Sequence, residues 1–201
     1  MTSALIGIAV GACNSKPDPQ ANARSDAGGE VAASASDTMS PSMSSGDTAM
    51  TGMGGMDSAG NPDQQFLRMM SDHHKGILLL AHDAIGRTGV SVKPEAQKID
   101  KAQDAEVKQM VAMLKNDFKD DYTPKVMKEN QSMADALTQK SGEAYDITFR
   151  KDVIKHHEAA LQMIDRFLPQ LTKPALKQMA QKMKKDQTRE IAQFKRELGQ
   201  S

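Results

Sequence analysis

Two pairs of adjacent histidines, His73-His74 and His156-His157, are the residues of this 201-residue chain best suited to chemistry. Imidazole nitrogens bind copper, zinc and iron, and thioether sulfurs beside them favour Cu(I) and Ag(I). Met69 and Met70 precede the first pair by one helical turn, so a helix would place them on the same face. The first pair therefore predicts a soft-metal site. Copper is the expected ion, with zinc and iron as alternatives.

The histidine pairs belong to an internal repeat with an offset of 83 residues. A Gln-x-x-Glu motif follows each pair and recurs at an offset of 84, so the loop between pair and motif differs in length by one residue in the two copies. The matched residues are Phe66 with Phe149, His73 with His156, His74 with His157, Gln103 with Gln187, and Glu106 with Glu190. The repeat predicts two similar helical hairpins.

Helical spacing places the polar residues of the repeat near the interior. His73 and His156 fall on the inward stripes of their helices, whereas His74 and His157 lie one position round, toward a neighbouring helix or the rim. Buried polar groups must be paired or must bind a metal. Histidine and glutamate could instead bond each other and fix the register of the helices, and buried methionines are commonly core packing. The predicted metal ligands are His73, His74, Met69, Met70, Met110, Glu106, His156, His157 and Glu190.

The elements that must position these residues are helices. Asn61-Pro62 is a typical helix start, because Asn caps well and Pro suits the first turn. Two hairpins bury their apolar faces best against each other, so the predicted fold is an all-α four-helix bundle. The predicted helices cover residues 62–85, 94–118, 124–139, 144–168 and 174 onward, with the 124–139 helix as the connection.

The N-terminal residues predict export. The short apolar run before Cys13 ends in Val-Gly-Ala-Cys, which is typical of a bacterial lipoprotein signal, so residues 1–13 are predicted to be a signal segment lipidated at Cys13. No Lys or Arg precedes the run, which fits a start codon assigned too far downstream. Asn14 rather than Asp follows the cysteine, which favours the outer membrane, with the protein facing the periplasm.

Residues 14–60 form a Met-, Ser- and Gly-rich linker that is predicted to be disordered and to tether the domain at residues 61–201. Its methionines could wrap a soft cation, or they could scavenge oxidants by cycling to the sulfoxide. They are Met39, Met43, Met50, Met53 and Met56.

Composition and motifs narrow the function. The chain has 26 basic and 26 acidic residues and few aromatics, so no nucleic-acid partner is expected. There is no catalytic-triad signature, phosphate-binding loop or Glu-x-x-His di-iron motif, so we expect sequestration or handover of a metal rather than turnover. Two alternatives stay open: a metalloenzyme of the oxidase type using His73, His156, Glu106 and Glu190, and a metal-free structural or interaction module of the envelope.

The pattern Phe66-x-x-Met-Met-x-x-His-His-x-Gly76, followed by Gln103-x-x-Glu-Val-x-x-Met110, resembles the bacterial domain of unknown function 305 family. The resemblance extends over residues 62–198 and implies a ferritin-like four-helix fold, export and, for some members, copper binding. The second copy departs from the pattern, because Val153 replaces Met70 and Phe194 replaces Met110. The first hairpin is therefore the better candidate for a soft-metal site.

Overall fold

The structure, a computed structural model, describes residues 60–200. This part of the chain is all-helical, as predicted, and none of its helices is long and apolar enough to cross a membrane. Cys13 and the five linker methionines lie outside the described residues, so the lipid anchor stays a prediction. The helices are α1 (Pro62–Gly86), α2 (Lys93–Phe118), α3 (Lys128–Thr138), α4 (Gly142–Phe167) and α5 (Pro174–Glu197).

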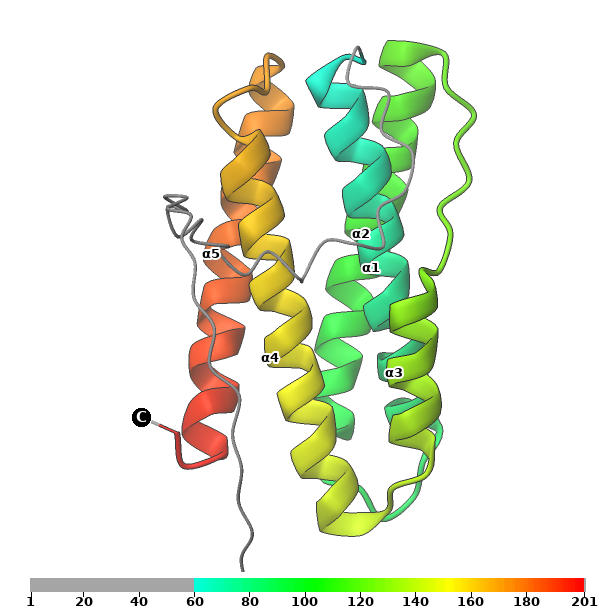
Figure 1. The fold of residues 1–201 in the computed structure, drawn as a ribbon, viewed down its shortest axis with the longest axis vertical. Coiled ribbons are helices and arrows are strands. Elements are labelled where there is room, and N and C mark those ends of the chain that lie inside the picture. The colour runs from blue at the N-terminus through cyan, green and yellow to red at the C-terminus, as the bar shows by residue number, and fades with distance from the viewer. Residues whose placement is uncertain (1–59, 201) are drawn as a thin grey trace, which may run out of the picture. The chain divides into compact units, whose positions relative to one another are not determined.

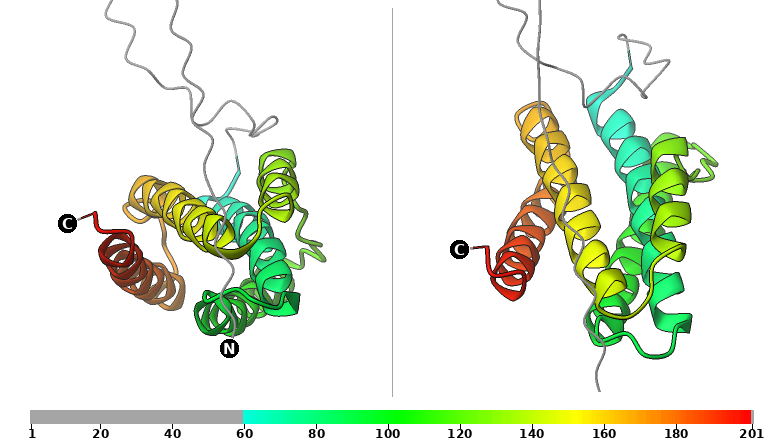
Figure 2. Two further views of the ribbon diagram at one scale, coloured as in Figure 1. Left: turned by 90° about the horizontal axis from the view of Figure 1, so that it is seen from below. Right: turned by 60° about the horizontal axis from the view of Figure 1, so that its bottom comes forward.

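Helices α1 and α2 form one antiparallel hairpin, and α4 and α5 form the other (Figure 1). The two hairpins meet mainly through α1 and α4, which run in opposite directions side by side, as the end-on view of Figure 2 shows. Helix α3 packs on both of them. The predicted four-helix bundle with a connecting fifth helix is confirmed.

Two aspartates at equivalent positions of the repeat fasten the hairpins to each other. The carboxylate of Asp63, at the start of α1, accepts hydrogen bonds from the backbone N–H and hydroxyl of Thr172, at 2.7 and 2.5 Å, just before α5. The carboxylate of Asp146, at the start of α4, accepts bonds from the backbone N–H and hydroxyl of Ser91, at 2.9 and 2.6 Å, just before α2. The duplication therefore extends from sequence to tertiary contacts, with an approximate twofold relation between the hairpins.

The predicted start of the connecting helix at Pro124 is wrong. Residues 119–127 are not helical, and α3 begins only at Lys128. This segment runs from the far end of α2 back along α1 (Figure 1). An extended chain covers that distance with fewer residues than a helix, because it spans about 3.3 Å per residue against about 1.5 Å in a helix. Asp72 of α1 holds it in place, because its carboxylate accepts bonds from the Tyr122 hydroxyl at 2.5 Å and the Lys125 backbone N–H at 2.7 Å.

Helix α3 approaches α1 closely at Gly76. A Cβ atom at this position would lie 2.0 Å from Nδ2 and 2.7 Å from Cβ of Asn130 on α3. The absence of a side chain at Gly76 therefore leaves room for the side chain of Asn130 against α1.

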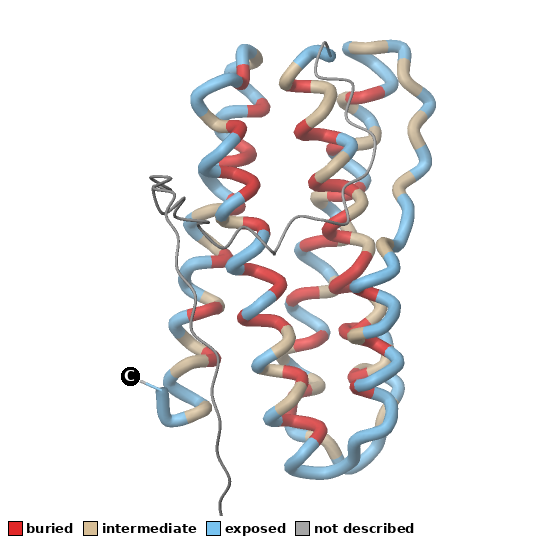
Figure 3. The backbone as a smooth tube through the Cα atoms, in the orientation of Figure 1, coloured by how far each residue is buried: buried red, intermediate tan, exposed pale blue. Residues whose placement is uncertain are grey.

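The buried residues line the facing sides of the helices and form two apolar clusters, one toward each end of the bundle (Figure 3). The first cluster gathers the start of α1, the end of α2, the end of α4 and the start of α5. The second cluster gathers the opposite ends of the same four helices together with α3. The residues between the two clusters along each helix include both histidine pairs and both Gln-x-x-Glu motifs, so a polar layer separates the two apolar cores.

Candidate metal centre

His73 of α1 and His156 of α4 meet in the middle of the polar layer. Each is 4% exposed, and their ring centroids lie 3.7 Å apart. Nε2 of His156 bonds to the backbone carbonyl oxygen of His73 at 3.0 Å. A carbonyl only accepts, so this nitrogen carries the proton and donates it. The predicted inward position of both residues is confirmed.

His74 and His157 each reach the partner helix of their own hairpin. Nε2 of His74 lies 2.9 Å from Oε2 of Glu106, and Nε2 of His157 lies 2.6 Å from Oε2 of Glu190. Both histidines are completely buried, so they face a neighbouring helix and not the rim, the two positions the sequence left open. The His–Glu bonds considered as the alternative to metal binding are therefore present, but they form within each hairpin and not across the bundle.

Six buried polar atoms of this layer have no hydrogen-bond partner among residues 60–200. They come in symmetric pairs from equivalent positions of the two repeats. They are Nδ1 of His73, His74, His156 and His157, and Oε1 of Gln103 and Gln187. An unpartnered buried polar atom is costly, and a lone pair on nitrogen, oxygen or sulfur is also what a metal ion requires. The layer therefore fits a ligand that accepts electron pairs.

Burial keeps the central histidines neutral. It lowers the pKa of His73 from 6.5 to about 3, and the neighbouring imidazoles of His74 and His157 lower it further. Burial also lowers the pKa of His156 well below 6.5, with the other three imidazoles acting in the same direction. Neutral imidazole is the form that binds metals, so protons compete little for these nitrogens near neutral pH.

Two thioethers flank the histidines in the first hairpin. Helices α1 and α2 are antiparallel, and His74 on α1 bonds Glu106 on α2. One helical turn from this bond toward the first cluster, the residue four before His74 therefore lies at the same height in the bundle as the residue four after Glu106. These residues are Met70 and Met110, both completely buried in that cluster. In the second hairpin the same positions are Val153 and Phe194, which lie in the second cluster. Only the first hairpin places thioethers beside its histidines in this way.

The methionines of the bundle helices gather at one end. Seven of them belong to or pack against the first cluster, which we call the methionine-rich end. Their equivalents in the other half of the repeat include no methionine. The pairs are Met69 with Asp152, Met70 with Val153, Met110 with Phe194, Met113 with Glu197, Met163 with Leu80, Met179 with Glu95, and Met183 with Ile99.

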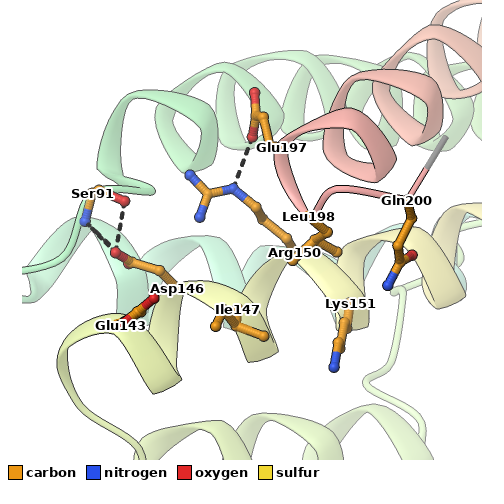
Figure 4. Close-up of a pocket in the computed structure, with 9 residues that line it drawn as sticks. All are labelled: Ser91, Glu143, Asp146, Ile147, Arg150, Lys151, Glu197, Leu198 and Gln200. Atoms are coloured by element: carbon orange, nitrogen blue, oxygen red, sulfur yellow. Dashed lines mark hydrogen bonds and ion pairs between the residues drawn. The ribbon is translucent and has the colours of Figure 1, made fainter.

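One position at the opposite end of the bundle is ionic where its equivalent at the methionine-rich end is apolar. Arg150, whose equivalent is Leu67, bonds Oε2 of Glu197 through Nε at 2.8 Å and lies 3.9 Å from Oε1 of Glu95. Figure 4 shows Arg150 and Glu197 in a polar pocket, beside the bonds between Ser91 and Asp146. Since these charged groups partner each other, this pocket is a poor site for a soft cation.

The structure brings some predicted ligands together and keeps others apart. His73 and His156 stack, and each glutamate bonds one histidine. Among residues 60–200, however, no group of three or more His, Cys, Asp or Glu side chains is arranged to hold a metal ion. The oxidase alternative needs His73, His156, Glu106 and Glu190 as one cluster, which this arrangement does not form.

The family model described as "Domain of unknown function (DUF305)" matches residues 18–114 and again residues 63–198. The chain belongs to this family. A solved DUF305 fragment from Deinococcus radiodurans shares 23% identity and a TM-score of 0.62, covering 71% of this chain and 98% of the fragment. A comparison with curated proteins gives no match.

The fold is also similar to that of CopM, which has been solved in metal-bound forms. The Cu(I)-bound form shares 26% identity and a TM-score of 0.58, covering 67% of this chain and 93% of CopM. The Ag-bound form, obtained by soaking, shares the same identity with a TM-score of 0.56, covering 67% of this chain and 92% of CopM. These are findings about CopM, and they indicate that metal binding occurs on this fold.

Sequence reasoning missed two features of the centre. One is the unpartnered Nδ1 of each histidine, which depends on where Nε2 points and therefore on tertiary packing. The other is the methionine-rich end. The sequence does contain a signal for it. At the repeat offsets Met163 aligns with Leu80 and Met183 with Ile99, so methionine is unequally distributed between equivalent positions of the two copies.

Proposed function

We propose that this protein binds copper as Cu(I), and Ag(I) similarly, at the first hairpin, and sequesters it or hands it over in the cell envelope. The proposed ligands are His74, Met70 and Met110, with His73 and Met69 beside them. Cu(I) is a soft ion whose thioether and imidazole complexes are stable in proteins. The role assigned to the protein is to present His74, Met70 and Met110 as buried donors on neighbouring helices.

One observation carries this proposal. Nδ1 of His74 is buried without a partner, on the same helical face as Met70, and the register of the hairpin brings Met110 to the level of Met70. The matched second hairpin acts as an internal comparison. It keeps His157 and Glu190 but has Val153 and Phe194 instead of thioethers, so it is proposed as a weaker or second site.

Two further observations support the choice of metal. Methionines chosen only to fill the core would be expected at both ends of a duplicated bundle, whereas here they gather beside one histidine pair. The similarity to CopM, solved with Cu(I), Cu(II) and Ag, supports copper over zinc or iron.

The test is a competition for Cu(I) between the full chain and a chromogenic Cu(I) chelator, under anaerobic reducing conditions. All variants carry Cys13→Ser, because a free thiol binds Cu(I) by itself. All also carry leucine in place of the five linker methionines. We expect the protein to remove Cu(I) from the chelator, and we expect His73→Gln with His74→Gln to weaken binding more than His156→Gln with His157→Gln. A protein that takes no Cu(I) from the chelator would refute the proposal.

The proposed envelope location rests on the sequence around Cys13 and needs its own test. Cells expressing the full chain are labelled with radioactive palmitate and then fractionated. We expect label on the wild-type protein and its recovery with membranes, with both lost in Cys13→Ser. An unlabelled wild-type protein recovered in the soluble fraction would rule out the anchor.

A further inference from the structure

Glu106 and Glu190 make the same bond in the two hairpins. Each lies on the second helix of its hairpin, is partly exposed, and places Oε2 within 2.9 or 2.6 Å of Nε2 of a completely buried histidine. The two hairpins differ at the neighbouring positions, where Met70 and Met110 correspond to Val153 and Phe194, yet this bond is present in both. The bond is thus independent of the thioethers.

An ionised carboxylate accepts hydrogen bonds and does not donate them. The proton of a neutral imidazole at His74 or His157 must then sit on Nε2, and the lone pair must sit on Nδ1. In both residues Nδ1 is buried and has no partner among residues 60–200. The carboxylates therefore select one tautomer and direct its free lone pair into the polar layer.

We propose that Glu106 and Glu190 are positioning residues that hold His74 and His157 as Nε2–H tautomers, so that a soft metal ion binds these histidines through Nδ1 while the carboxylates remain outside its ligand set. This revises the expectation that both glutamates are themselves ligands. It rests on the proposed function for the identity of the ion. A carboxylate in this place also raises the basicity of the imidazole, and loss of such a partner typically weakens metal binding by 10- to 100-fold.

The first experiment uses the metal-free wild-type chain. Long-range ¹H–¹⁵N correlation spectra distinguish a protonated imidazole nitrogen from one with a lone pair. We expect His74 and His157 to give the pattern of a protonated Nε2 and an unprotonated Nδ1. Finding either residue with its proton on Nδ1 would overturn the carboxylate part of the inference, and this result needs neither a variant nor a metal.

The second experiment adds Ag(I), which is diamagnetic. In this and the following measurements every chain carries Cys13→Ser and leucine in place of the five linker methionines, because a free thiol binds Ag(I) by itself. We expect the Nδ1 signal of His74 to shift and to couple to silver, while Nε2 keeps its proton. Silver coupled to Nε2 would overturn the inference while leaving the proposed function intact. Failure of Ag(I) to bind at all would overturn the proposed function and the metal half of this inference, while the metal-free spectra would still decide the carboxylate half.

Variants then measure the size of the effect, with Asp104→Asn as the matched control. Asp104 lies on the same helix, half-exposed, and its carboxylate pairs with Lys108 instead of a histidine. We expect Glu106→Leu to weaken Ag(I) binding by about 10- to 100-fold, Glu106→Gln to weaken it less because its amide oxygen can still accept the bond, and the control to leave it unchanged. Equal affinities for wild type and a folded Glu106→Leu would contradict a positioning role.

Discussion

Replacing His73 by glutamine should make the metal-free protein less sensitive to mild acid. Burial in the stack with His156 lowers the pKa of His73 from 6.5 to about 3 in the folded state. The unfolded chain takes up a proton at His73 near pH 6.5, whereas the folded protein does not do so until about pH 3. The stability contributed by the neutral histidine is therefore complete above pH 6.5 and is lost as the pH falls toward 3.

The expected magnitude follows from this difference. Between pH 7 and pH 5, protonation of His73 in the unfolded state alone lowers the free energy of unfolding by about 2 kcal/mol. By pH 3 the loss is roughly 4 kcal/mol, and its limit at lower pH is roughly 5 kcal/mol, since each pKa unit corresponds to about 1.4 kcal/mol. His156 adds a loss in the same direction, because its pKa is also lowered. Most carboxylates titrate below pH 5, so this window isolates the histidines.

The assay is urea unfolding of the full chain at pH 7 and pH 5, with EDTA present, for wild type, His73→Gln and His82→Gln. His82 is an exposed histidine on the same helix that pairs with Asp100 at 2.7 Å, and its substitution controls for the loss of a histidine that is not buried. We expect the free energy lost between the two pH values to fall by about 2 kcal/mol in His73→Gln, with no such fall in His82→Gln. An equal loss in wild type and His73→Gln would refute the claim that His73 is buried in its neutral form.

Three further outcomes follow from the packing and the site. Gly76→Ala should destabilise the protein by about 1–3 kcal/mol in urea unfolding, because the new Cβ would overlap Asn130. Adding Asn130→Gly should recover part of this loss. If nothing is recovered, the clash lies elsewhere. Asp72→Asn should speed amide hydrogen exchange in residues 119–127 more than in α4, because Asp72 bonds Tyr122 and Lys125. An equal increase in both regions would argue against Asp72 as the residue that holds this segment. Free Ag(I) at about 100 times its dissociation constant should stabilise the chain with Cys13→Ser and leucine at the five linker positions by about 2.7 kcal/mol in thermal unfolding. No shift would count against a site specific to the folded state.

The helices of the bundle could be predicted because their signals are local. The 3.6-residue period, Asn61-Pro62 and Pro174 set their positions, and the matched histidines predicted two hairpins before any contact was known. The connecting helix was misplaced for the opposite reason. Pro124 is an acceptable helix start by itself, but the distance to be spanned and the bonds to Asp72 keep residues 119–127 extended.

The centre was predictable in composition and less so in arrangement. Spacing alone placed His73 and His156 inside, and comparison of the copies placed the thioethers in the first hairpin. The same spacing left His74 and His157 undecided between a neighbouring helix and the rim, because a residue at the edge of a stripe is buried only if the next helix covers it. Which nitrogen meets Glu106 depends on the side-chain conformation, which the sequence pattern does not contain.

The central claim is that thioethers and an imidazole of the first hairpin bind Cu(I) together. The most direct measurement is the Cu(I) affinity of Met70→Leu with Met110→Leu, compared with wild type and with Met163→Leu, all with Cys13→Ser and leucine at the five linker positions. Met and Leu differ little in volume, so the fold should be kept at a cost below about 1.5 kcal/mol per site while the sulfur atoms are removed. We predict at least a tenfold loss of affinity for the double variant, and little change for Met163→Leu. Undiminished Cu(I) binding by the folded double variant would contradict the account.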